Sequence, residues 1–278
     1  MIRMMTSLCW IVSAFILAGC AAPAATPQAS ARDVAPAPSY RGPYSRPLSD
    51  VPPANEAASK ARVHTELGME YLGIGRTKVA LDEARIALEA SSAYAPAHHL
   101  LGLIYMELEQ HGQADEAFRR AIAAAPGDPD FNNSYGWFLC GRGRFAEAMS
   151  HFATAQANPY YCCKARPRIN AGLCLLKNND PAGAETQFAK ALEADPASGE
   201  ALYQLAQAVY RRGNYRRAHD LLVQYHQRFD PAARSVWLGL RAARRLGEHH
   251  AETSYTEQLR GRFAGSPESA LLMQGKYE

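Results

Sequence analysis

The chain repeats itself with a period close to 34 residues, and this repeat restricts the fold more than any other feature of the sequence. A small residue recurs at positions 68, 102, 136, 172, 206 and 239, so the successive spacings are 34, 34, 36, 34 and 33 residues. Each small residue is followed by alanine twelve residues later, and in five of the six repeats by a bulky residue sixteen residues later. Self-similarity at this period is typical of repeat arrays, in which each unit packs mainly against its neighbours.

The pattern resembles the tetratricopeptide repeat, whose signature pairs Leu-Gly and Tyr in one helix with Ala and Phe in the next. Six units cover about residues 61–263. The resemblance implies an all-α fold, a right-handed superhelical solenoid of about six helix hairpins. Small residues at the eighth and twentieth positions of a unit let its two helices approach closely. We expect Gly75, Gly143 and Gly213 to end first helices, because glycine adopts the left-handed conformation at no steric cost.

The N-terminus has the organisation of an exported lipoprotein. Arg3 precedes an apolar stretch, residues 8–17, which suits the h-region of a secretory signal and is too short to span a membrane. The sequence LAGC at residues 17–20 resembles the bacterial lipobox, which implies that Cys20 is acylated and begins the mature chain. Ala21 resembles the second residue of lipoproteins sent to the outer membrane. A cleaved signal with an incidental cysteine is the alternative.

The segment after Cys20 is expected to be a tether. Residues 21–53 contain eight prolines and few large apolar residues, too little to offset the entropy lost on ordering. The sequence therefore predicts a signal peptide at 1–19, a lipidated cysteine and disordered Ala/Pro-rich tether at 20–59, the solenoid at 60–264 and a C-terminal tail at 265–278. We expect a periplasmic domain held at the outer membrane by its lipid anchor.

Composition and motifs argue against several other classes of protein. The net charge of +3 is small, and the basic residues have no interleaved aromatic residues on a stripe, so nucleic-acid binding is not expected. The sequence shows no Gly-rich phosphate loop, no recognisable Ser/His/Asp arrangement and no spaced carboxylate pair. We expect no enzymatic activity, no cofactor and no small-molecule substrate.

The tetratricopeptide register also predicts which residues line a groove. In this family the second, fifth, ninth, twelfth and thirteenth positions of each unit face the concave side. Carried over by register, they give thirteen residues that we call the groove residues: Met69, Leu72, His99, Leu103, Met106, Asn133, Trp137, Ile169, Leu173, Leu176, Tyr203, Gln207 and Tyr210. Ten of them are apolar or aromatic, and a soluble protein rarely leaves such a strip uncovered.

Two kinds of occupant could cover this strip. We expect an amphipathic helix or an extended apolar segment of a partner protein, with Trp137, Tyr203 and Tyr210 as aromatic anchors. The C-terminal helix or the tether folding into the groove is the alternative. Capture of a C-terminal carboxylate, as in chaperone-binding members of the family, is not expected because Thr65 and Met69 occupy the first-unit positions of the required polar pair.

Four cysteines remain after Cys9 in the signal and Cys20. Cys140 and Cys174 fall at nearby registers of adjacent first helices, which favours a disulfide between them. Cys162 and Cys163 lie in the insertion that lengthens the third spacing to 36 residues, and either is an alternative partner for Cys140. Neither CxxC spacing nor a suitably placed histidine completes a zinc ligand set, so no metal site is expected.

Four stretches go beyond the generic repeat: NNSYGWFLC (132–140), INAGLC (169–174), WLGLRAARRLG (237–247) and SYTEQLRGRF (254–263). They resemble the type IV pilus biogenesis and stability lipoproteins, the pilotins of the pilus secretin. This resemblance implies an outer-membrane lipoprotein that binds a secretin subunit and promotes its localisation and multimerisation. The alternative function is a general adaptor lipoprotein in outer-membrane protein or peptidoglycan assembly.

Overall fold

The structure is a computed structural model that describes residues 46–277. The predicted signal peptide, Cys20 and the tether up to residue 45 lie outside the described residues. Within residues 46–277 every regular element is helical, and no helix combines the length and the apolar character that crossing a membrane would require.

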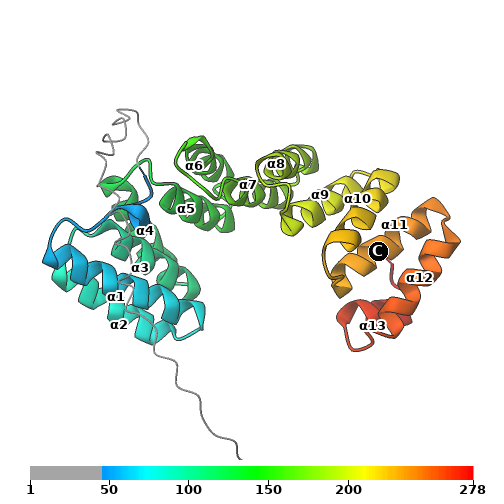
Figure 1. Cartoon of the computed structure of the whole chain (residues 1–278), viewed down its shortest axis with the longest axis horizontal. Helices are drawn as coiled ribbons and strands as arrows, with labels where there is room; N and C mark the ends of the chain where they lie inside the picture. Colours follow the sequence, from blue (N-terminus) through cyan, green and yellow to red (C-terminus); the bar gives the residue numbers. More distant parts are fainter. Residues whose placement is uncertain (1–45, 278) are drawn as a thin grey trace, which may run out of the picture. The chain divides into compact units, whose positions relative to one another are not determined.

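Six helix hairpins follow one another in chain order (Figure 1), so the predicted all-α tetratricopeptide solenoid is confirmed. The hairpins, called units one to six, are α1 (Glu56–Gly73) with α2 (Thr77–Ala90), α3 (Ala95–Glu107) with α4 (His111–Ala124), α5 (Pro129–Gly141) with α6 (Phe145–Ala157), α7 (Ala165–Lys177) with α8 (Pro181–Ala194), α9 (Gly199–Arg211) with α10 (Tyr215–Arg228), and α11 (Ala233–Leu246) with α12 (His249–Arg260). A 3-10 helix, η1 (Leu48–Asp50), precedes them and α13 (Pro267–Met273) follows.

The helices of a hairpin meet where the small residue of the first helix faces the bulky residue of the second. A Cβ atom built on Gly102 would lie 2.6 Å from Phe118, and one on Gly172 would lie 2.5 Å from Phe188. Both phenylalanine side chains are completely buried. Because this approach is too close for a methyl group, glycine is required wherever the second helix carries an aromatic ring.

Units one and five solve the same packing problem with different pairs. In unit five the pair is Ala206 and Leu222, and both are fully buried. Alanine is larger than the glycine of the other units, and leucine is smaller than their aromatic residue. In unit one Ala84 replaces the aromatic ring, and Leu100 from the next unit lies against Gly68 instead. The pair of unit five thus has a combined volume similar to that of glycine with phenylalanine, whereas in unit one a side chain from the next unit fills the space.

The turn inside each of the six hairpins passes through one left-handed residue, which is Gly247 with φ of 71° in unit six. Gly75, Gly143 and Gly213 have φ of 75°, 74° and 81°, as predicted for the ends of first helices. Units two and four use Glu109 and Asn179 at the same place, with φ of 56° and 58°. The left-handed geometry is thus a property of the turn, and glycine is its least strained occupant.

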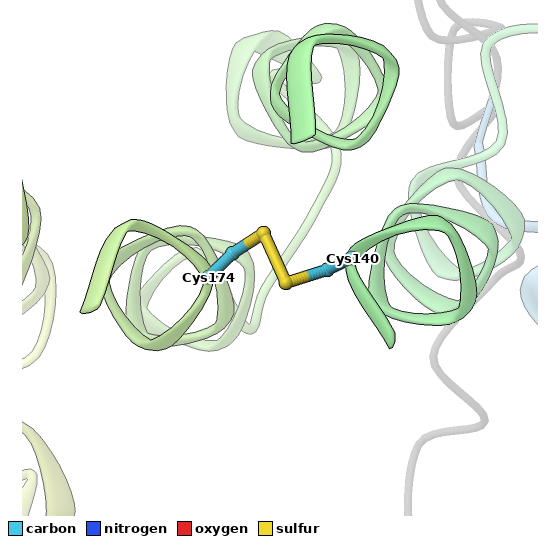
Figure 2. Close-up of a disulfide and its surroundings, with 2 residues drawn as sticks. All are labelled: Cys140 and Cys174. Atoms are coloured by element: carbon cyan, nitrogen blue, oxygen red, sulfur yellow. A yellow bond between two sulfur atoms is a disulfide. The ribbon is translucent and has the colours of Figure 1, made fainter. Parts of the chain in front are cut away.

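A disulfide joins Cys140 at the end of α5 to Cys174 in α7 (Figure 2). Their Cα atoms are 5.8 Å apart and both residues are buried. Earlier in the same two helices, the Asn170 side-chain amide donates a 2.9 Å hydrogen bond to the side-chain oxygen of Asn133. Units three and four are therefore joined by a covalent and a polar link.

Two terminal segments pack on the solenoid. Among residues 46–51, Pro47 is buried, Leu48 packs against a cluster that includes Phe131, and the Leu48 N–H donates a 2.8 Å hydrogen bond to Asp128. Helix α1 begins at Glu56, ahead of the boundary expected at residue 60. Residues 265–277, expected as a tail, contain α13, which packs against α11 and α12.

We predict that Gly172→Ala lowers the free energy of unfolding by about 1–3 kcal/mol, because the new methyl group overlaps the Phe188 ring. Adding Phe188→Leu should recover part of the loss, since the double variant recreates the pairing of unit five. Gly141→Ala is the matched control, because a Cβ there meets no atom within 4 Å. Urea denaturation followed by circular dichroism measures all three; equal effects of Gly172→Ala and Gly141→Ala would contradict the packing account.

Candidate protein-binding groove

The first helices of successive units pack side by side, so residues one repeat apart come together on a common face. Four groove residues are buried rather than open on this face: His99, Asn133, Tyr203 and Tyr210. Met69 is 39% exposed. The other eight are half-buried: Leu72, Leu103, Met106, Trp137, Ile169, Leu173, Leu176 and Gln207.

A cavity of about 470 Å³ opens on this face across units one to three. Three groove residues line it, namely Met69, His99 and Leu103. Phe131, Tyr94 and Pro96 extend its apolar wall, and the described residues of α1 add Arg62, Thr65, Glu66 and Glu70. Asp128, Asp130 and Arg166 also line it, so the cavity combines apolar residues with charged groups from both α1 and the α5–α7 side.

Ion pairs engage both arginines around this cavity. Arg62 lies 3.4 Å from Glu66 within α1, and Arg166 lies 3.8 Å from Asp130. The Asp130 carboxylate also accepts a 2.9 Å hydrogen bond from the Tyr161 hydroxyl. Glu70 lines the cavity without an ion pair to any of residues 46–277. The rim is therefore weakly acidic, which favours an apolar ligand segment that carries a basic group.

His99 sits at the apolar end of the cavity. Its ring lies 4.9 Å from the ring of Phe131, and its Nε2 atom has no hydrogen-bond partner in the described part of the chain. Burial lowers the pKa of His99 to about 4, so the ring is neutral at neutral pH. In a neutral imidazole the Nε2 atom donates or accepts one hydrogen bond, depending on the tautomer, which suits the polar end of an inserted side chain or a peptide group.

The N-terminus of α5 forms one wall of the cavity through Asp128. The carboxylate of Asp128 caps α5 by accepting 3.0 Å hydrogen bonds from the N–H groups of Asp130 and Phe131, besides the bond from Leu48. Burial raises the pKa of Asp128, and these three donors oppose the rise. One buried carboxylate thus positions the helix and holds residues 46–51 beside the cavity, where Ser49 joins its lining.

The predicted aromatic anchors differ in how accessible they are. The ammonium of Lys177 lies 5.1 Å from the centre of the Trp137 ring, which remains half-buried. The guanidinium groups of Arg234 and Arg241 lie 4.7 and 4.8 Å from the rings of Tyr203 and Tyr210, which are only 6% and 8% exposed. Trp137 is the most accessible of the three, while the tyrosines are covered by cations of the next unit.

A second cavity, of about 750 Å³, lies on the same face at units four and five. It is lined by the groove residues Ile169 and Leu173 together with Asn170, Glu200 and the segment from Cys162 to Arg166. Leu176 packs on the neighbouring core, which contains Tyr203 and Tyr210. The groove residues Met69, His99 and Leu103 therefore line a different cavity from Ile169 and Leu173.

The chain itself covers the face at unit six. The fifth, ninth and twelfth positions of this unit are Val236, Leu240 and Ala243, and all three are fully buried in a cluster with Leu272 of α13, whereas Arg244 at the thirteenth position is exposed. The Tyr277 ring stacks on Trp237 at 5.8 Å. Helix α13 therefore packs on α11 in unit six, beyond the thirteen groove residues.

Several cavity residues could have been found by applying the same register to every unit. Arg62, Asp130 and Arg166 occupy the second position of their repeat units, which is one of the groove positions. Met69 and Leu103, which were predicted, occupy the ninth position. Ser49 and Asp128 carry no repeat signal, because the segment that contains Ser49 is held by the hydrogen bond from the Leu48 N–H to Asp128, which joins residues 80 apart. The structure shows no group of three or more potential metal ligands among residues 46–277.

Family models for the tetratricopeptide repeat match residues 65–129, 99–161 and 175–242. The type IV pilus assembly protein PilF of Pseudomonas aeruginosa is 30% identical over 205 residues, which is 74% of this chain and 81% of PilF. The chain belongs to the tetratricopeptide-repeat family that includes the type IV pilus biogenesis proteins.

Solved structures support the same relationship. The structure of P. aeruginosa PilF is 28% identical and matches with a TM-score of 0.70, covering 80% of this chain and all of that one. PilW, described as a widely conserved type IV pilus biogenesis factor, is 31% identical with a TM-score of 0.71, covering 79% of this chain and all of PilW. Tetratricopeptide repeats mediate protein–protein interactions, so the groove belongs to the surface type that such repeats use for binding.

We predict that acid destabilises this family member through His99, which is buried, and His226, which is half-buried. The pKa values of His99 and His226 are both lowered to about 4, mainly by burial, whereas the ordinary value is 6.5. Between these values the unfolded chain binds protons that the folded chain does not. Each histidine should therefore lower the free energy of unfolding by about 1.4 kcal/mol for each pH unit of acidification, from about 6.5 down to about 4.

The variant His99→Phe should remove one of these two contributions, because phenylalanine fits between the Phe118 and Phe131 rings and does not titrate. Urea denaturation between pH 4 and 7 measures the slope. His250→Phe is the control, since His250 is exposed on α12. An unchanged slope in His99→Phe would show that His99 does not titrate in this way.

Proposed function

We propose that this protein is an outer-membrane lipoprotein that acts as pilotin for the type IV pilus secretin. In this function the solenoid binds a secretin subunit through the open part of the groove, and the acyl chains on Cys20 bring the complex to the periplasmic face of the outer membrane. Its role is binding and delivery, without a catalytic step. The observation that carries the proposal is the match to PilF and PilW, which covers 74% of the chain in sequence and 79–80% in structure.

Two features of the chain support the proposed location. The lipobox at residues 17–20 gives a chemical means of anchoring, and stable anchoring takes more than one acyl chain. The buried disulfide between Cys140 and Cys174 suits an oxidising compartment such as the bacterial periplasm. A tether from Cys20 to η1 would keep the groove near the membrane, which raises the effective concentration of binding sites there.

The groove supports binding of a protein segment at units one to four. The cavity of units one to three combines an apolar floor with Glu66, Glu70 and Asp130, and the half-buried ring of Trp137 lies on the next part of the same helix layer. Since α13 covers unit six, the partner segment enters from the N-terminal side of the solenoid. A helix with one apolar residue per turn would fit this face, and so would an extended strand with an apolar residue at every second position.

We predict that Leu103→Ala combined with Trp137→Ala weakens secretin binding at least about tenfold, because each removes a large apolar contact. Ile74→Ala combined with Leu108→Ala is the matched control, since both residues are exposed at hairpin turns away from the groove. Pull-down of a purified secretin subunit, with circular dichroism as a check on folding, measures both. Equal binding by the two double variants would overturn groove binding. Recovery of a protein of outer-membrane barrel assembly or peptidoglycan assembly in the pull-down, instead of the secretin, would favour the general adaptor function.

We predict that Cys20→Ser leaves the solenoid folded and moves both this protein and the secretin away from the outer membrane. Cell fractionation on a density gradient locates both proteins, and heat-resistant secretin multimers report assembly. Cys9→Ser is the control, because Cys9 precedes the expected cleavage point and is removed with the signal. Normal secretin multimers at the outer membrane in the Cys20→Ser strain would contradict the role of the anchor.

A further inference from the structure

Cys162 and Cys163 are the described cysteines that lie outside the disulfide. They occupy the connection between α6 and α7, in the insertion that lengthens one repeat to 36 residues. Both are exposed, and their Sγ atoms lie 3.2 Å apart. Two accessible thiols at this distance can react with the same reagent in sequence.

The residues around the pair are fixed to unit three. Asn158 is fully buried and its side-chain amide donates a 2.8 Å hydrogen bond to the Gly127 carbonyl. Tyr161 is buried and donates to Asp130, and Ala165 begins α7 in a buried position. The two cysteines therefore project from a short segment whose flanks are held, which keeps the two sulfur atoms together.

Cys162 and Cys163 lie beside the groove and take no part in the disulfide between Cys140 and Cys174. Cys162 and Cys163 line the cavity of units four and five together with Ile169 and Leu173. Cys140 and Cys174 are only 2% and 1% exposed, so an external disulfide reaches the exposed pair and not the buried one.

We propose that Cys162 and Cys163 form a thiol–disulfide exchange site, in which the dithiol is converted reversibly into a vicinal disulfide by a protein or small-molecule disulfide. One thiolate attacks a sulfur of the oxidant, forms a mixed disulfide and releases the first oxidant thiolate. The second thiolate then attacks the protein sulfur of that mixed disulfide, which forms the Cys162–Cys163 bond and releases the second oxidant thiolate. The two cysteine protons end on the released thiolates; the protein loses two electrons and the oxidant gains them.

This site has the chemistry of a labile pair rather than of a structural cross-link. A disulfide between adjacent residues closes a strained small ring, and strained, exposed disulfides are the ones that are readily reduced again. The hydrogen bond with Cys162, followed by burial, raises the pKa of Cys163. Because thiolate is the attacking species, oxidation should become faster as the pH rises into the alkaline range.

The test uses the purified full-length chain in buffers with increasing ratios of oxidised to reduced glutathione. Trypsin releases residues 145–164 as one peptide, and its mass reports the state of the pair. The expected product is a peptide lighter by two hydrogen atoms and free of glutathione, which returns to the dithiol when reduced glutathione is restored. The peptides that contain Cys140 and Cys174 should stay linked throughout.

Single variants provide the matched controls. Cys162→Ser and Cys163→Ser each leave one thiol, so each should accumulate a stable glutathione adduct on this peptide because the second attack cannot occur. A persistent adduct in the unmodified chain, a disulfide-linked dimer, or exchange with Cys140 or Cys174 would overturn the proposal, as would no reaction at any ratio. Circular dichroism of each variant establishes that the solenoid is folded.

Discussion

The structure depends on one steric contact, repeated along the chain: the approach of a small residue in the first helix of a hairpin to a bulky residue in the second. A methyl group on Gly102, Gly136 or Gly172 would lie within 3 Å of the facing phenylalanine ring. Because the contact fixes how closely two helices pack, it also fixes where the next hairpin can stack. Unit five meets the same requirement with Ala206 and Leu222, and unit one meets it with Leu100 from the next unit.

This packing produces a surface as well as a core. The bulky residues of the second helices fill the interior of each hairpin, so the first helices are left to line a common face. The disulfide and the Asn133–Asn170 hydrogen bond hold that face together between units three and four. α13 covers it at unit six, and two cavities open in the units before. These contacts preorganise the face, and a preorganised surface loses less conformational entropy when a partner binds.

The repeat made most of the fold predictable from sequence, because each unit satisfies the same local rules for turns, small residues and aromatic residues. Gly75, Gly143 and Gly213 mark the turns, and the family resemblance assigns the all-α solenoid correctly. The groove could be predicted only in part. The repeat register gives the side of the helix on which a residue lies, but it does not show which other residues cover it. Tyr203 and Tyr210 are covered by arginines from another unit, and His99 is enclosed by Phe118 and Phe131. The Leu48–Asp128 contact and α13 lie outside the repeat and left no periodic signal.

The central claim is that the face built from the first helices holds a secretin subunit. Hydrogen–deuterium exchange of this protein, alone and in complex with a purified secretin subunit, tests it most directly, because it reports every helix in one experiment. The account predicts that the partner slows exchange of amides in α1, α3, α5 and α7, with little change in α2, α4, α6 and α8. Slowed exchange confined to the second helices, or to α13, would contradict it.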